Sequence, residues 1–142
     1  MSSILAKESV PEFTLGGNAT ITIRSSSLAK RYTYKIQQHK DDKNLYFIKL
    51  LRGQDNENDY SYIGCYYSDT QYFHPCKTWK FEQKENWPHS IKMIDFFFKH
   101  LYNLPDRLEV YHEGKCARCG RKLTTPESIK SGFGPECRRF VV

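Results

Sequence analysis

The chain has 142 residues, of which 39% are hydrophobic and 27% are charged. This balance is typical of a folded globular domain and excludes a disordered chain. No apolar run approaches the length of a membrane-spanning helix, and the N-terminus lacks the basic and apolar regions of a secretion signal. The formal net charge is +6, and aromatic residues make up an unusually high 15%.

The N-terminal residues 1–17 are mixed in character and predict a loose segment with a short strand near Phe13. From residue 18 onward, alternating apolar and polar residues predict a series of strands separated by short turns. We expect these strands at 19–24, 31–36, 45–51, 60–67 and 70–73. Their close spacing favours an antiparallel meander.

Two details of this sheet can be predicted from the pattern of its side chains. Strand 45–51 is apolar on both faces except at Lys49, which indicates a central position. In strand 60–67, strict alternation places Tyr60, Tyr62 and Tyr66 on one face. We expect such tyrosines to fill a half-buried sheet rather than to form a stacking surface for bases, because few Arg and Lys residues lie between them.

One helix is expected after Pro88, from His89 to about Asn103. An apolar stripe at helical spacing would face the sheet, and Lys92, Asp95 and Lys99 would face water. A final strand at 108–111 then leads into the C-terminal residues. The predicted fold is therefore α+β: a meander of about five strands packed on one helix (residues 18–107), followed by a small zinc-binding module (residues 108–142).

The C-terminal residues contain three of the five cysteines in the pattern His-x3-Cys-x2-Cys-x17-Cys. Structural zinc prefers four Cys or His ligands in a tetrahedron. The sequence therefore predicts one structural zinc ion bound by His112, Cys116, Cys119 and Cys137. The three cysteines carry most of this prediction, and the rivals of His112 for the fourth position are His100, Cys76, His74 and a water molecule.

The residues between the second and third cysteines predict two short helices. Thr125 followed by Pro126 is typical of an N-cap and first helical position, and Gly132 is a typical helix end. Gly134-Pro135 then begins a second helical turn that contains Cys137. A Cys-x-x-Cys turn combined with a further cysteine in the first turn of a helix is the arrangement found in treble-clef modules.

These residues also resemble a known family. The run Cys-x-x-Cys-Gly-Arg-x-Leu-Thr, then Pro-x-Ser-Ile, then Gly-x-Gly-Pro-x-Cys is similar to a small zinc module of unknown function that recurs in bacteriophage and bacterial proteins. The resemblance covers about thirty residues. It implies a zinc fold and a phage or mobile-element origin, and it implies no reaction or substrate. We therefore expect a protein of the cytoplasm, either bacterial or that of an infected host, where thiolates stay reduced.

The positive charge is concentrated in the same module. Between residues 115 and 139, seven basic residues stand against two acidic ones. Such a concentration predicts contacts with nucleic-acid phosphates, which are independent of sequence and weaken with salt. The expected contacts are Lys115, Arg118, Arg121, Lys122, Lys130, Arg138 and Arg139.

The alternative function is a protein-interaction module that binds and inhibits a host protein, such as a defence nuclease, through its aromatic sheet or the acidic loop at 53–59. No Gly-rich phosphate loop, nucleophile elbow or catalytic triad is recognisable, so we expect no enzymatic activity. We also expect no membrane partner.

Overall fold

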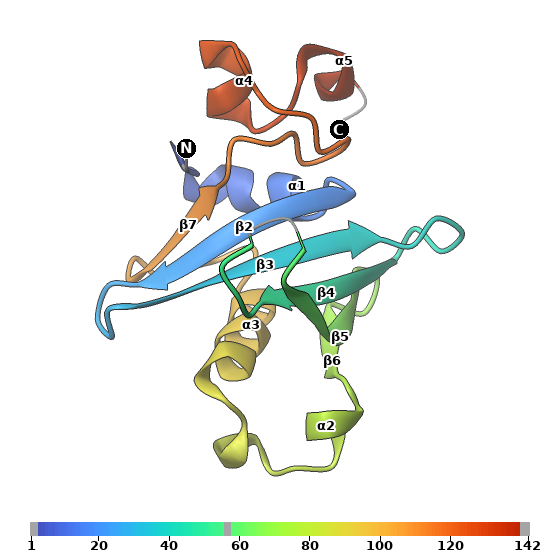
Figure 1. The fold of residues 1–142 in the computed structure, drawn as a ribbon, viewed down its shortest axis with the longest axis vertical. Helices are drawn as coiled ribbons and strands as arrows, with labels where there is room; N and C mark the ends of the chain where they lie inside the picture. Colours follow the sequence, from blue (N-terminus) through green and yellow to red (C-terminus); the bar gives the residue numbers. More distant parts are fainter. Residues whose placement is uncertain (1–2, 56–57, 140–142) are drawn as a thin grey trace.

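The computed structural model describes residues 3–55 and 58–139 and has an α+β fold, as the sequence predicts (Figure 1). Its centre is one antiparallel sheet of seven strands in the order β1-β7-β2-β3-β4-β5-β6. The strands are β1 (Ser3–Ile4), β2 (Asn18–Ser25), β3 (Lys30–Gln38), β4 (Leu45–Leu51), β5 (Tyr60–Tyr67), β6 (Tyr72–Pro75) and β7 (Leu108–His112). The α-helices are α1 (Val10–Thr14), α2 (Lys77–Lys80), α3 (His89–Lys99), α4 (Pro126–Ser131) and α5 (Pro135–Arg138).

The expected meander is confirmed for β2 to β6, each of which pairs with the next in sequence. The sheet is larger than the expected five strands because the strand predicted at 108–111 joins it as β7 and the N-terminal β1 adds a seventh. After β6 the chain returns through α3, and β7 pairs with β2 on one side and with β1 on the other. Strand β7, the second strand from one edge of the sheet, therefore anchors the C-terminal module directly to the sheet.

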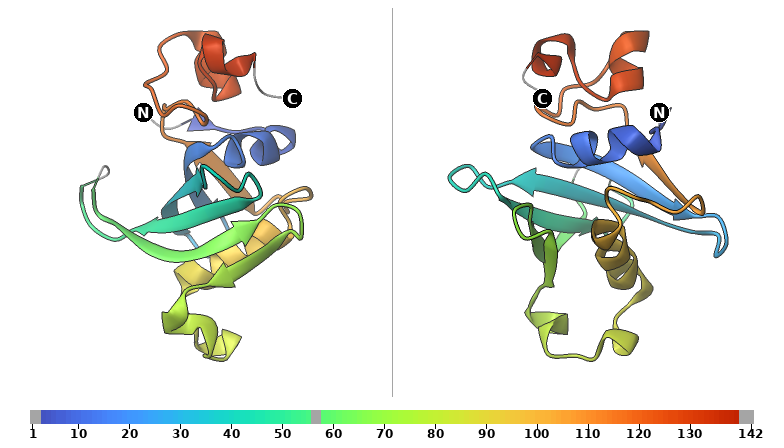
Figure 2. Two further views of the ribbon diagram at one scale, coloured as in Figure 1. Left: turned by 90° about the vertical axis from the view of Figure 1, so that its right-hand side faces the viewer. Right: turned by 180° about the vertical axis from the view of Figure 1, so that it is seen from behind.

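Helices α1 and α3 lie on the same face of the sheet, in front of the strands when the molecule is seen from behind (Figure 2, right). The hydroxyl of Tyr34 on β3 donates a 2.6 Å hydrogen bond to the carbonyl of Ser90 in α3. Tyr66 on β5 stacks on Phe98 of α3 with ring centroids 4.0 Å apart. On the same face, the Tyr46 hydroxyl donates to the carbonyl of Leu15, immediately after α1.

The expectation of a loose N-terminal segment with a strand near Phe13 is wrong for the described residues 3–17. Phe13 lies in helix α1, and its side chain is completely buried. Val10 in the same helix is only 1% exposed. Both belong to a single core that also includes sheet residues and Cys116 and Phe133 of the module. The segment thus forms a layer between the sheet and the module.

The predicted faces of β5 are also partly wrong, because its pairing with β4 is irregular. Ile48 pairs with Gly64, but the next residue, Lys49, pairs with Tyr62. This β-bulge inserts one extra residue into β5 and exchanges the two faces beyond it. Tyr60 and Tyr62 therefore lie on the face opposite to the buried Tyr66 instead of beside it.

The apolar stripe of the predicted helix is confirmed in α3, which ends at Lys99, earlier than expected. Its stripe is buried, namely Ile91, Ile94, Phe97, Phe98 and, just beyond the helix, Leu101. Asp95 was expected to face water but is only 8% exposed, and its carboxylate forms ion pairs with Lys84 and Lys99.

Among the described residues, no helix has the length and apolarity needed to cross a membrane. Residues 56–57 of the acidic loop lie outside the described part.

Candidate metal centre

The first two cysteines lie in a tight hairpin formed by residues 115–122. Lys115 and Lys122 form an antiparallel bridge, and the amide of Cys116 donates to the carbonyl of Arg121 at 2.8 Å. The amide of Gly120 closes the turn on the carbonyl of Cys116 at 2.9 Å. Gly120 has φ +80°, a left-handed conformation that glycine adopts at little cost. The hairpin therefore brings Cys116 and Cys119 to the same side.

The return to the third cysteine follows the predicted caps. The Thr125 side chain accepts from the amide of Ser128 at 3.2 Å and so caps α4, with Pro126 as first helical residue. Gly132 ends α4 at φ +81°, and Gly134 precedes Pro135 at the start of α5. These two short helices fold the chain back and place Cys137, which is buried, against the hairpin.

The sulfur atoms of Cys116, Cys119 and Cys137 all lie within 4.8 Å of one another. A tetrahedral site with Zn–S distances of about 2.3 Å requires sulfur atoms about 3.8 Å apart, so small side-chain shifts would suffice for one ion. Cys116 and Cys137 are buried, whereas Cys119 is exposed. The three thiols therefore fit a metal ion that is held from the core side and faces solvent beside Cys119.

The surroundings of Cys116 favour the thiolate form that metals bind. Burial alone would raise the pKa of this thiol, but the backbone N–H groups of Cys119, Gly134 and Arg118 outweigh it and lower the pKa to about 7. One of these contacts is the Arg118 amide, 3.4 Å from Sγ. Burial and the neighbouring thiols raise the pKa of Cys137, against the lowering effect of the Arg118 guanidinium 3.6 Å from its sulfur.

His112 was expected as the fourth ligand, and the structure does not bring it to the cysteines. Its Nδ1 accepts from the amide of Gly114 at 3.0 Å, and its Nε2 lies 2.6 Å from the carbonyl of Ile129, to which it donates. The ring is fully buried and stacks on Phe13 with centroids 5.5 Å apart. Burial lowers the pKa of His112, which is consistent with a neutral ring that ties β7 to α4.

The other candidates for a fourth position do not join the cysteines either. Among residues 3–55 and 58–139, the group that could hold a metal ion consists of the three cysteines, and no His, Cys, Asp or Glu joins it as a fourth member. His74 lies on β6 with its ring beside Tyr72, and His100 lies beside Phe96 at the end of α3. Cys76 follows β6 on the far side of the sheet from the module (Figure 1).

Replacing His112 with alanine tests its observed position. We expect the variant to keep one metal ion per chain but to lose about 2–4 kcal/mol of unfolding free energy, because two buried hydrogen bonds and a stacked ring disappear. Elemental analysis of the purified chain gives the metal content, and urea unfolding gives the stability. A variant that is stable but contains no metal would instead identify His112 as a ligand.

The seven basic residues of the module differ in their surroundings. Arg138 pairs with Glu12, Arg139 pairs with Glu136 at 2.6 Å, and Arg118 reaches Cys137. Lys115 is half-buried and also takes part in a contact within the protein. The exposed members on the hairpin and on α4 are Arg121, Lys122 and Lys130.

Comparison with known proteins identifies this C-terminal part alone. The model of a family of unknown function, DUF6011, matches residues 106–141, which include β7 and the cysteine module. No curated protein and no solved structure matches the chain. The match and the three clustered cysteines together define a small C-terminal module that can hold a metal ion.

Proposed function

We propose that the chain is a nucleic-acid-binding protein of phage or mobile-element origin, whose C-terminal module is held together by one structural zinc ion and contacts phosphates. Three thiolates are a soft ligand set, which favours zinc over hard cations such as magnesium or calcium. Zinc would connect the hairpin to α5, two segments that are otherwise short and contain little core of their own.

The observation that carries the proposal is the pairing of two lysines on the hairpin. Lys115 and Lys122 are direct partners in the antiparallel bridge, so their side chains emerge on the same face. Together with Arg121 in the adjacent position, they concentrate positive charge on the hairpin, and each lysine can contact a phosphate of a bound strand.

The surroundings of the exposed Cys119 thiol also support a phosphate-binding surface on the hairpin. Cys119 is the exposed member of the cysteine group, and Arg118, Arg121 and Lys122 are exposed around it. A zinc ion held by three thiolates leaves a net negative charge at the centre, so the surrounding cations also stabilise the metal site. Contacts of this kind with phosphates are expected to be independent of base sequence.

The test is a salt series of binding with the double variant Lys115→Glu/Lys122→Glu. Fluorescence anisotropy with random 20-nucleotide single strands and 20-base-pair duplexes gives the affinity at each salt concentration. Each phosphate contact contributes about 0.7 to the logarithmic salt slope on single strands and about 0.9 on duplexes. We expect the slope to fall by about 1.4–1.8 and the affinity to drop on both ligands.

The matched control is Lys77→Glu/Lys80→Glu, which makes the same charge change on α2 at the opposite end of the molecule (Figure 1). This control is expected to change the affinity only slightly. Equal losses in the two double variants would show that overall charge alone attracts the nucleic acid, and the proposal would fail. Elemental analysis that finds another metal, or none, would overturn the assignment of zinc.

A further inference from the structure

One face of the central sheet has no helix packed on it in the part of the chain that the structure describes. Residues paired across antiparallel strands point to the same face. Tyr34, Tyr46 and Tyr66 point toward α1 and α3. The alternate positions of β2 to β7 therefore form an open face, which is turned toward the viewer in Figure 1. Its aromatic members are Phe47, Tyr60, Tyr62, Tyr67, Tyr72, His74 and Tyr111.

The aromatic rings on the open face are arranged in two groups. Phe47 lies between His39 and Tyr62, with centroid distances of 5.6 Å and 6.1 Å. His74 lies between Tyr67 and Tyr72, at 5.5 Å and 4.7 Å. Tyr62 is 49% exposed and Tyr72 is 57% exposed. These rings have accessible faces, in contrast to the tyrosines of the covered face.

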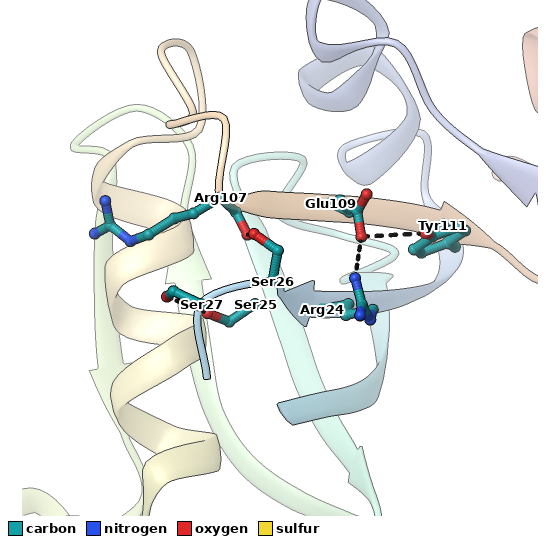
Figure 3. A network of polar contacts seen from close by, with 7 residues as sticks. All are labelled: Arg24, Ser25, Ser26, Ser27, Arg107, Glu109 and Tyr111. Carbon is teal, nitrogen blue, oxygen red and sulfur yellow. Dashed lines mark hydrogen bonds and ion pairs between the residues drawn. The ribbon is translucent and has the colours of Figure 1, made fainter. Parts of the chain in front are cut away.

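Cations lie on the neighbouring strands of the same face, and the Lys35 ammonium lies 4.4 Å from the centroid of the Tyr60 ring. Lys35 on β3 pairs directly with Lys49 on β4, and Arg24 on β2 pairs directly with Arg31 on β3. Arg24 is neutralised by Glu109, which also accepts from the Tyr111 hydroxyl (Figure 3). The positions of β2, β3, β4 and β7 on this face therefore hold four cations against one carboxylate. This excess of cations can attract the phosphates of a strand.

A shallow groove of about 580 Å³ lies at the end of the open face where Phe47 is found, and one of its lining residues, Asn18, is next to the cysteine hairpin. Its lining includes Asn18, Gln37 and Gln38 together with Phe47. The Asn18 side chain borders the hairpin, because a Cβ atom on Gly120 would lie 2.7 Å from its amide nitrogen. Amide side chains can both donate to and accept from the edges of bases.

We propose that the open face binds single-stranded nucleic acid, with bases stacked on its exposed aromatic rings and phosphates beside Lys35, Lys49 and Arg31. The strand would continue through the amide-lined groove to the hairpin lysines. A duplex cannot use this face in the same way, since its bases are already stacked on one another. The inference deepens the proposed function and rests on it for the class of ligand, but it concerns a separate surface with its own residues.

The test uses the double variant Tyr62→Ala/Tyr72→Ala and the anisotropy assay with single strands and duplexes. Loss of a stacked base lowers affinity by between about 5-fold and 150-fold. We expect a loss of this size for single strands and almost none for duplexes. Tyr62→Phe/Tyr72→Phe, which keeps the rings, is expected to bind single strands nearly as well as the unmodified chain. Tyr102→Ala, at a tyrosine 62% exposed beyond α3, is the matched control.

The outcomes separate this inference from the proposed function. If the alanine variant binds single strands normally while Lys115→Glu/Lys122→Glu does not, the hairpin contacts phosphates and the open face does not bind the strand. That result would leave the open face available to a protein partner. If the unmodified chain binds neither single strands nor duplexes, the inference and the proposed function both fail. Because both tyrosines are largely exposed, a melting curve close to that of the unmodified chain is expected and excludes loss of folding as the cause.

Discussion

Cys116→Ser is expected to release the metal ion and to unfold the module from Glu113 to the end of the described chain. The Cys116 sulfur is buried and accepts backbone N–H groups, so a serine hydroxyl would neither bind the metal comparably nor fill the space. Structural zinc contributes roughly 10–16 kcal/mol of apparent binding free energy in small zinc peptides, and the module is as small as those peptides. Elemental analysis and amide hydrogen exchange would measure the two effects.

The hydrogen-exchange pattern of this variant is expected to extend into the N-terminal segment. The amide of Asn18 donates to the carbonyl of Ala117 at 2.6 Å, and Phe13 packs on Phe133, so α1 loses its partner when the module unfolds. Strands β3 to β5 should keep their protection. Cys65→Ser, outside the cluster, is the control. Uniform loss of protection through β3 to β5 would show that the whole chain unfolds as one unit.

Phe13→Ala is expected to destabilise the protein strongly, because this ring links the N-terminal segment to the module. The Phe13 ring is fully buried, stacks on His112 and meets the ring of Phe133 at 6.1 Å. It also lies so close to Gly132 that a Cβ atom there would be 2.3 Å from it. Removal of such a ring leaves a cavity and costs about 3–5 kcal/mol.

Urea unfolding of Phe13→Ala would measure this effect, with tryptophan fluorescence and metal release as the two observables. We expect the metal to be released at lower urea than in the unmodified chain, because the module loses its support on α1. Phe81→Ala is the control, since that ring is 88% exposed and its removal should change stability by less than about 0.5 kcal/mol. A similarly small change for Phe13→Ala would mean that module and sheet are energetically independent.

The parts of the fold that the sequence predicts are those determined by local chemistry. Thr125, Pro126 and Gly132 specify the beginning and end of α4 within eight residues, and the structure places each in its predicted role. The apolar stripe of α3 depends only on helical periodicity, and it is buried as expected. The three cysteines were recognisable because their spacing and glycines describe a hairpin and a helical return.

The parts that the sequence does not predict depend on contacts between distant residues. Helix α1 has five residues, too few for a helical pattern, and it is stabilised by the module packed over it. The bulge at Ile63, between the pairs Ile48–Gly64 and Lys49–Tyr62, has no signal in the alternation of β5, yet it decides which tyrosines are exposed. His112 has a spacing suitable for a ligand, but the carbonyl of Ile129 and the amide of Gly114 occupy its nitrogens.

The position of β7 between β1 and β2 also bears on the order of folding during synthesis. Strands β2 to β6 can pair as they emerge from the ribosome, but the free edge of β2 must wait for residues 108–112. Until then it is an unpaired hydrogen-bonding edge, which is prone to aggregation. A truncation designed to remove the cysteine module should therefore end after His112. A truncation that ends before Leu108 would leave the β7-facing edge of β2 permanently unpaired, and we expect the resulting protein to be insoluble.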